Sequence, residues 1–122
     1  VGPVVILDHP RERTPLCKKK RGDDALIERV EPYLCGMEVG NAYSELNDPF
    51  VQKKLLEEQA QQLRAGNEEA HPYDADFIEA LEVGMPPTAG LGVGIDRMTM
   101  LLTDSPSIRD VLAFPFMKPE EE

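Results

Sequence analysis

Glycine alternates with other residues in the segment Thr-Ala-Gly-Leu-Gly-Val-Gly-Ile-Asp-Arg, which covers residues 88–97. A strand needs side chains to pack, so Gly90, Gly92 and Gly94 all weaken this one unless a flat group lies against it. The spacing GxGxG differs from the GxGxxG of dinucleotide-binding folds, and no strand-helix-strand unit surrounds it. We therefore expect a strand that brings bare backbone close to a planar or phosphorylated ligand, and a nucleotide fits this description.

Length and charge narrow the class of protein. A chain of 122 residues buries one modest core, and a net charge of −10 argues against a main nucleic-acid surface. No segment has the pattern of a secretory signal or the length of about 20 apolar residues that spans a bilayer. Cys17 and Cys35 lack the spacing of a zinc site, which favours a reducing, cytoplasmic location. The basic run 18–21 is interpreted as a solvated loop.

Two further segments predict strands of a mainly antiparallel sheet. The apolar run 4–7, enclosed by prolines, is typical of a strand buried on both faces. Residues 27–45 predict an antiparallel hairpin whose turn is Cys35-Gly36. Because Pro32 has no N–H to donate, its strand is expected to lie at an edge or to meet a bulge there.

Helical patterns account for most of the remaining sequence. Asp48 followed by proline predicts a helix that continues to Arg64, with its glutamines facing water. A second helix is expected from Asp74 to Gly84, with Phe77 buried. A third helix follows the glycine strand, and a short fourth follows residues 105–106. The order of elements predicts an α+β fold, a mainly antiparallel sheet backed by helices. The side chains expected to face inward in the last two helices are Ile95, Met98, Leu101, Leu102, Ile108, Val111 and Leu112.

The predicted hairpin brings two glutamates together. If Cys35-Gly36 is the turn, Tyr33 pairs with Glu38, and Glu31 lies diagonal to Glu38 on the same face. Diagonal neighbours are about 7–8 Å apart at the backbone, which allows two carboxylates to share a divalent cation. The pair is interpreted either as a magnesium site that carries nucleotide phosphates or as two solvent-facing glutamates of an edge hairpin.

Asn41, Tyr43 and Glu45 alternate along the second strand of the hairpin and therefore share a face. An amide, an aromatic wall and a carboxylate suit a ligand that carries an ammonium group. Strict alternation places Glu38 on the opposite face from Asn41, so the two sets serve one site only if a bulge occurs at Gly40.

Arg97 lies off the apolar stripe in the first turn of the third helix. From there its guanidinium can project beyond the glycine strand, stack on a purine or form paired hydrogen bonds to phosphate oxygens. The alternative interpretation is a surface arginine paired with Asp96 or Asp104.

Four segments resemble a known family. Residues 92–97, Gly-Val-Gly-Ile-Asp-Arg, and residues 107–115, Ser-Ile-Arg-Asp-Val-Leu-Ala-Phe-Pro, resemble motif 3 of class II aminoacyl-tRNA synthetases of the aspartate, asparagine and lysine group. Residues 38–49, Glu-Val-Gly-Asn-Ala-Tyr-Ser-Glu-Leu-Asn-Asp-Pro, and residues 82–88, Glu-Val-Gly-Met-Pro-Pro-Thr, resemble lysyl-tRNA synthetases within that group. The resemblance extends from residue 4 to residue 118.

The resemblance implies an ATP subsite. Glu31 and Glu38 would hold the Mg²⁺ ions that bridge the ATP phosphates, which makes Mg²⁺ the implied cofactor. Gly92 and Gly94 would leave room for substrate. Arg97 would be the catalytic residue, stacking on adenine and approaching the γ-phosphate.

The resemblance also implies a lysine pocket formed by Asn41, Tyr43 and Glu45, with Glu45 facing the side-chain ammonium. The implied reaction activates lysine with ATP to give lysyl-adenylate and transfers it to tRNA(Lys). The implied partners are thus ATP, L-lysine and tRNA(Lys), with no membrane contact from this segment. A paralogue that lysylates elongation factor P or a lipid, and a non-catalytic module with a synthetase-like fold, are the alternatives.

Residues 1–122 are expected to be the C-terminal portion of such a catalytic domain. The chain begins with Val1, and no candidate was found for motif 1, for motif 2 with its α-phosphate arginine, or for an anticodon-binding domain. The resemblance implies a homodimeric full-length parent. The isolated chain is therefore expected to be inactive.

Overall fold

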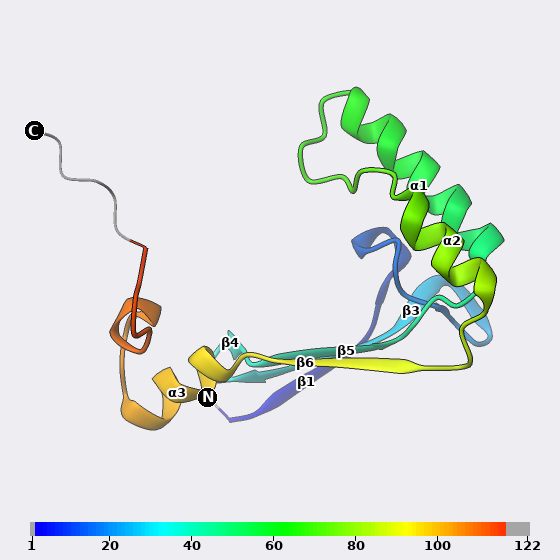
Figure 1. Cartoon of the computed structure of the whole chain (residues 1–122). Helices are drawn as coiled ribbons and strands as arrows, with labels where there is room; N and C mark the ends of the chain where they lie inside the picture. The colour runs from blue at the N-terminus through cyan, green and yellow to red at the C-terminus, as the bar shows by residue number, and fades with distance from the viewer. Residues whose placement is uncertain (1, 117–122) are drawn as a thin grey trace, which may run out of the picture.

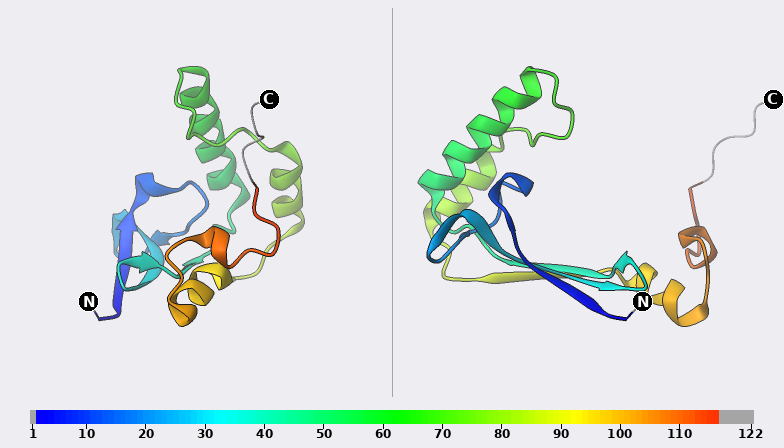
Figure 2. Two further views of the ribbon diagram at one scale, coloured as in Figure 1. Left: turned by 90° about the vertical axis from the view of Figure 1, so that its left-hand side faces the viewer. Right: turned by 180° about the vertical axis from the view of Figure 1, so that it is seen from behind.

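The computed structural model describes residues 2–116. An antiparallel sheet of six strands forms a long platform, with α1 and α2 rising over one end and α3 at the other (Figures 1 and 2). This architecture confirms the predicted α+β class. The elements in chain order are β1 (Val4–Pro10), η1 (Arg11–Arg13), β2 (Lys19–Lys20), β3 (Asp23–Leu34), β4 (Met37–Glu38), β5 (Gly40–Ser44), α1 (Pro49–Arg64), α2 (Ala75–Val83), β6 (Ala89–Val93), α3 (Ile95–Thr103) and η2 (Ile108–Asp110).

The sheet has the order β1-β3-β5-β6, and β2 and β4 also pair with β3. The hairpin turns at Cys35 and Gly36, whose φ angles of 51° and 80° place both in the left-handed region. Leu34 pairs with Met37 and Tyr33 pairs with Glu38, which confirms the predicted register. Pro32 lies in β3, which has neighbouring strands on both sides, so it is not at an edge of the sheet. It meets the bulge that is described below.

The prediction that residues 4–7 are buried on both faces is wrong. β1 is an edge strand, hydrogen-bonded only to β3 in the sheet path. Its exposed fractions reach 57% for Val5 and 62% for Leu7. A continuous apolar run predicts a strand whose faces pack against other elements. On the face that carries Leu7, the described residues provide no such packing partner.

Helix α1 begins where the sequence predicts. The side chain of Asp48 accepts hydrogen bonds from the amides of Phe50 and Val51, and proline occupies the first helical turn. The expectation that every glutamine of α1 faces water is wrong for Gln52, which is 1% exposed. Its Nε2 donates to the carbonyl of Pro15 at 3.0 Å, so a buried side-chain amide ties the helix to the preceding loop.

Helix α2 begins after Asp74, whose side chain accepts a hydrogen bond from Phe77 N at 2.9 Å, and it buries Ile78 and Leu81. The predicted burial of Phe77 is wrong, since 39% of it is exposed. Within residues 2–116, no helix is both long and apolar enough to cross a membrane.

Helix α3 buries Met100, whereas Ile95 and Leu102, expected to face inward, are 68% and 82% exposed. The predicted fourth helix is only the three-residue turn η2, so Val111 and Leu112 lie beyond it. At both places the apolar pattern predicts burial, but the described residues supply no surface that packs against these side chains.

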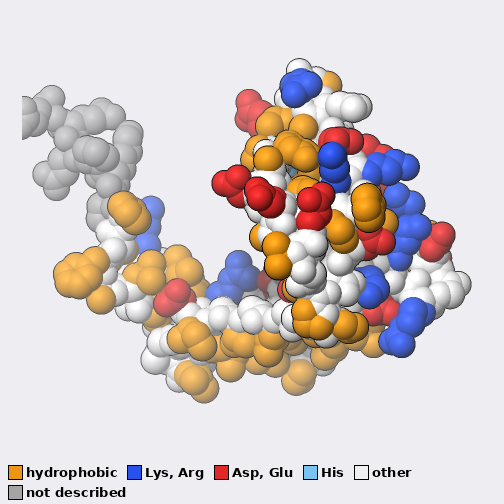
Figure 3. Space-filling model, turned by 45° about the vertical axis from the view of Figure 1, so that its right-hand side comes forward, with side chains coloured by type: hydrophobic (Ala, Val, Ile, Leu, Met, Phe, Trp, Pro, Cys, Tyr) orange, Lys and Arg blue, Asp and Glu red, His pale blue; other side chains and the backbone are white. Residues whose placement is uncertain are grey.

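The two faces of the sheet differ in chemistry. We call the face over which α1 and α2 rise the upper face. Hydrophobic side chains gather along the opposite, lower face in Figure 3, where the register places Leu91 and Val93. The compact core lies instead at the helical end of the molecule. Its buried side chains include Cys17, Ile27, Leu46, Leu56, Ile78 and Leu81.

Candidate functional site

A bulge between β4 and β5 decides which side chains share the upper face. Tyr33 pairs with Glu38, but Val30 pairs with Ala42, so the second strand of the hairpin contains one extra residue between these pairs. The extra residue reverses the alternation and brings Glu38 to the same face as Asn41. The bulge that a single site requires is therefore confirmed.

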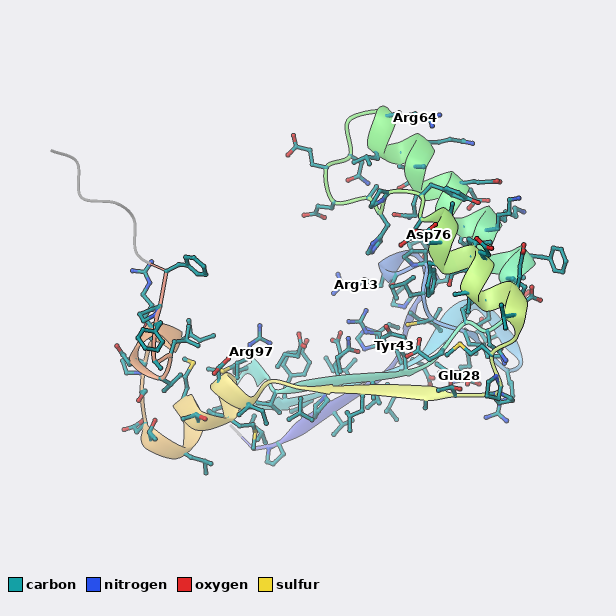
Figure 4. The ribbon with its side chains drawn as sticks, in the orientation of Figure 1. Arg13, Glu28, Tyr43, Arg64, Asp76 and Arg97 are labelled. Atoms are coloured by element: carbon teal, nitrogen blue, oxygen red, sulfur yellow. The ribbon has the colours of Figure 1, made fainter. Side chains whose placement is uncertain are left out.

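Polar side chains from the hairpin and from α3 lie on the upper face. Arg29 pairs directly with Tyr43, so the odd-numbered residues 29–33 face the same side as Tyr43. Figure 4 shows Tyr43 and Arg97 above the sheet, and the alternation along β3 places Glu28 on the opposite face. We call the following residues the upper-face cluster: Arg29, Glu31, Tyr33, Glu38, Asn41, Tyr43, Glu45 and Arg97.

Glu31 is buried at the centre of this cluster, with 3% of its side chain exposed. Arg29 Nη2 lies 2.5 Å from Glu31 Oε1, and the hydroxyl of Tyr33 donates to Oε2 at 3.0 Å. This hydrogen bond raises the pKa of Tyr33, since deprotonation would remove the donor. His9 Nε2 lies 3.7 Å from the same Oε2. Glu31 is therefore a buried, paired carboxylate and not the solvent-facing group of the alternative interpretation.

Glu38 and Arg97 meet where the sheet ends at α3. Arg97 Nη1 donates to the backbone carbonyl of Glu38 at 2.9 Å and lies 3.7 Å from Glu38 Oε1. The sequence suggests Asp96 and Asp104 as surface partners of Arg97. Neither forms an ion pair with Arg97 in the described structure. A wide, open cavity of about 630 Å³ adjoins this pair. Its lining includes Tyr33, Met37, Glu38, Arg97, Met100 and Ile108.

The alternating glycines lie where the side chains of β5 need space. Gly92 is opposite Asn41 and Gly90 is opposite Tyr43. A Cβ atom at Gly92 would meet only a carbonyl oxygen at 3.8 Å, and one at Gly94 would meet only Arg97 at 3.5 Å. Both glycines thus leave the upper face open toward a ligand. A Cβ atom at Gly90 would lie 2.1 Å from Glu45 Oε1, so this glycine is required for the observed position of the carboxylate.

The upper face carries, in sequence order, Asn41, Tyr43 and Glu45. They lie at the end of the cluster that is nearer to α1 and α2. Arg29 Nε donates to Asn41 Oδ1 at 3.1 Å. Burial, followed by the nearby carboxylate of Glu45, raises the pKa of Tyr43. Tyr43 therefore stays neutral at physiological pH.

The donor set of the two glutamates fits Mg²⁺, the cation that the family resemblance implies. Glu38 is 37% exposed, and Glu31 keeps a lone pair on each oxygen after its donors are counted. Within residues 2–116, no group of three or more His, Cys, Asp or Glu side chains forms a metal cage. Since Mg²⁺ usually takes one or two carboxylates and fills its shell with phosphates and water, the pair suits an ion that arrives with a nucleotide.

Three residues of this site were not found from the sequence. Arg29 has no place among the sequence predictions, although it contacts both Glu31 and Asn41. His9 also has no place among the predicted site residues, but it is 7% exposed and lies 3.7 Å from Glu31. Gly90 was assigned no role beyond the glycine pattern. The sequence signal for Arg29 is a charged residue inside a strand, since Arg29 and Glu31 alternate in a segment that also contains Ile27.

A second cavity of about 410 Å³ lies under α1, and no residue of the upper-face cluster lines it. It is lined mainly by apolar side chains, among them Cys17, Ile27, Leu46, Val51 and Leu55. The four-residue basic run lies nearby and is paired within the chain, for example Lys20 with Asp8 and Arg21 with Glu28.

The two thiols are expected to differ sharply in reactivity. Both cysteines are free, Cys35 is exposed, and burial raises the pKa of Cys17 to about 11. Because the thiolate is the reactive form, one thiol per folded chain should react rapidly with a disulfide reagent at pH 8. Cys17 should react only after denaturation or as the pH approaches its raised pKa. Cys35→Ser should abolish the rapid phase, and a rapid phase that persists in this variant would contradict the burial of Cys17.

Comparison with known proteins identifies the family. A family model described as "tRNA synthetases class II (D, K and N)" matches residues 1–118. A lysine–tRNA ligase of Clostridium novyi is 58% identical over 117 residues, which is 96% of this chain and 23% of the relative. A lysine–tRNA ligase of Saccharolobus solfataricus is 56% identical over 116 residues, 95% of this chain and 24% of the relative. One from Pediococcus pentosaceus is 59% identical over 117 residues, 96% of this chain and 24% of the relative.

The chain spans about a quarter of the length of the relatives it matches. The chain belongs to the class II aminoacyl-tRNA synthetases of the aspartate, lysine and asparagine group.

Proposed function

We propose that this chain is the C-terminal portion of the catalytic domain of a lysine–tRNA ligase, including its motif 3. The full-length enzyme contains this chain as one segment of a protein as long as its relatives. It activates L-lysine with ATP and transfers it to tRNA(Lys). The family resemblance further implies a cytoplasmic homodimer. The observation that carries the proposal is that the nucleotide and amino-acid residues occupy successive parts of one polar face.

The nucleotide subsite lies at the α3 end of the cluster. Arg97 is anchored by its hydrogen bond to the Glu38 carbonyl, and its guanidinium plane can stack on adenine while its donors reach the γ-phosphate. Gly92 and Gly94 add no side chain that would exclude the nucleotide. Glu31 and Glu38 would hold Mg²⁺, which when bound neutralises phosphate charge. The contribution of these residues is positioning and electrostatic stabilisation.

The amino-acid subsite lies further along β5. Glu45 supplies the anion for the ammonium group of lysine, and Tyr43 forms a neutral wall beside its aliphatic stem. Gly90 leaves the space in which the Glu45 carboxylate lies. With the ammonium held at Glu45, the carboxylate end of lysine is directed toward the nucleotide subsite. Attack of that carboxylate on the α-phosphorus gives lysyl-adenylate and pyrophosphate.

A chimera tests this function directly. The matching segment of the Clostridium novyi ligase is replaced by this chain, and lysine-dependent ATP–pyrophosphate exchange and aminoacylation of tRNA(Lys) are measured. We expect both activities in the chimera, and no exchange by the isolated 122-residue chain, because its sequence offers no candidate for the motif 2 arginine that would contact the α-phosphate. The unmodified ligase is the positive control.

A folded chimera that prefers another amino acid would contradict the assignment to lysine. Exchange with lysine but no transfer to tRNA(Lys) would favour another acceptor, such as elongation factor P or a lipid. A folded chimera with no exchange would favour a non-catalytic module. Robust exchange by the isolated chain would contradict the division of the site between two segments.

A further inference from the structure

We propose that Arg29 is a positioning residue that connects the metal-binding carboxylate to the amino-acid pocket. Its guanidinium holds Glu31 in place and fixes the amide of Asn41 so that the N–H donors of that amide face the substrate. This inference rests on the proposed function and assigns the part of lysine that Asn41 contacts.

Arg29 lies in the middle of the upper-face cluster. Its side chain is 15% exposed, directly opposite Tyr43 on the neighbouring strand. Nη2 lies 2.5 Å from Glu31 Oε1, and Nε donates to Asn41 Oδ1 at 3.1 Å. One planar group therefore contacts residues of both proposed subsites at the same time.

The chemistry of the guanidinium determines the orientation of the Asn41 amide. Arginine has five N–H donors and no acceptor, so only the Oδ1 side of the amide can face it. Within residues 2–116, Asn41 Nδ2 donates to no other side chain, and it remains available for a ligand. Since Nδ2 carries two donors, its partner must be an acceptor, such as an oxygen of the substrate carboxylate.

This orientation gives the pocket a direction. Glu45 accepts from the ammonium end of lysine, while Asn41 donates to the carboxylate end. Asn41 lies four residues from Glu45 along the chain and, because of the bulge, on the same face as Glu38. The carboxylate, which is the attacking group, is thereby placed at the end of the pocket nearest to the nucleotide subsite.

Lysine cannot replace Arg29 in this role. An ammonium group is a point charge on a flexible stem, whereas the planar guanidinium holds two partners in fixed directions. Glu31 is also 3% exposed, so weaker pairing by a lysine would leave a buried carboxylate less well oriented. We therefore expect Arg29→Lys to weaken lysine binding and to raise the Mg²⁺ requirement.

The test uses the full-length enzyme and two readouts. The affinity for L-lysine alone is measured by calorimetry without ATP or Mg²⁺, and the Mg²⁺ concentration that supports half-maximal exchange is measured separately. Arg29→Lys is expected to weaken lysine binding at least tenfold and to raise the half-maximal Mg²⁺ concentration at least threefold. The matched control is Arg21→Lys, because Arg21 pairs with Glu28 at 3.0 Å on the lower face; it should change neither value.

A double-mutant comparison separates positioning from a general structural effect. If Arg29 acts on lysine through Asn41, then adding Arg29→Lys to Asn41→Ala should change lysine affinity less than twofold further. A full tenfold additional loss would overturn the inference. Asn41→Asp keeps an acceptor for Arg29 but removes the donors, so it should also weaken lysine binding at least tenfold. That variant remains informative if Arg29→Lys fails to fold, and unchanged lysine affinity in it would equally overturn the inference.

Failure of the proposed function and failure of the role of Arg29 give different results. If the unmodified full-length enzyme does not bind L-lysine, the proposed function fails. If it binds L-lysine and Arg29→Lys binds as tightly, only the role of Arg29 fails.

Discussion

Glutamine in place of Glu45 is expected to raise the KM for L-lysine in the full-length enzyme by roughly 100-fold, since loss of one partner of a desolvated charge pair costs about 3 kcal/mol. The KM for ATP should change little, because Glu45 lies at the end of the cluster away from Arg97. The backbone at this position is held independently of the side chain, with Glu45 N donating to the Thr88 carbonyl at 3.0 Å. The effect should therefore be confined to the pocket.

ATP–pyrophosphate exchange measured against varied lysine and varied ATP gives both constants. The matched control is Glu28→Gln, because Glu28 accepts from Ser44 at 2.7 Å and from Arg21 on the lower face. That control should leave the KM for lysine near its original value. Equal increases in both KM values for Glu45→Gln would exclude Glu45 from the amino-acid pocket.

Alanine in place of Arg97 is expected to lower kcat/KM for ATP by roughly 1000-fold. Stacking on adenine and a charge-assisted contact to phosphate together contribute about 4 kcal/mol. Arg97→Lys keeps the charge but loses the planar group, so an intermediate decrease is expected. Lysine binding in the absence of ATP should be unaffected in both variants.

Single-turnover formation of lysyl-adenylate at varied ATP measures this effect. Arg64→Ala is the control, because Arg64 lies at the far end of α1 in Figure 4. A change in the unfolding temperature of Arg97→Ala beyond that of the control would reveal a structural contribution from its hydrogen bond to the Glu38 carbonyl. A stable Arg97→Ala enzyme that keeps its kcat/KM for ATP would remove Arg97 from the catalytic group.

Local signals predicted the elements of this fold well. The cap at Asp48, the turn at Cys35-Gly36 and the hairpin register all depend on neighbouring residues and were found at the expected positions. Burial was predicted less well, because it depends on what covers a surface. The apolar residues of β1, together with Ile95 and Leu102, fit inward patterns but are exposed.

The site followed the same division between local and spatial information. Alternation placed Asn41, Tyr43 and Glu45 on one face, and the need for a bulge could be stated in advance. The contacts of Arg29 and the close approach of Gly90 to Glu45 could not, since both depend on side-chain positions across strands. Local chemistry thus predicts the candidate residues, and the cross-strand register determines which of them meet.

The extra residue between β4 and β5 has a consequence for the comparison of related genes. Loss of the bulge without loss of a residue would turn Asn41 and every alternate residue after it toward the apolar face, because residues three apart lie on opposite faces of a regular strand. The identities of those residues would be preserved, yet the pocket would disappear. Among homologues, a spacing of three between these two positions therefore requires a bulge, whereas a spacing of two would place both side chains on one face of a regular strand.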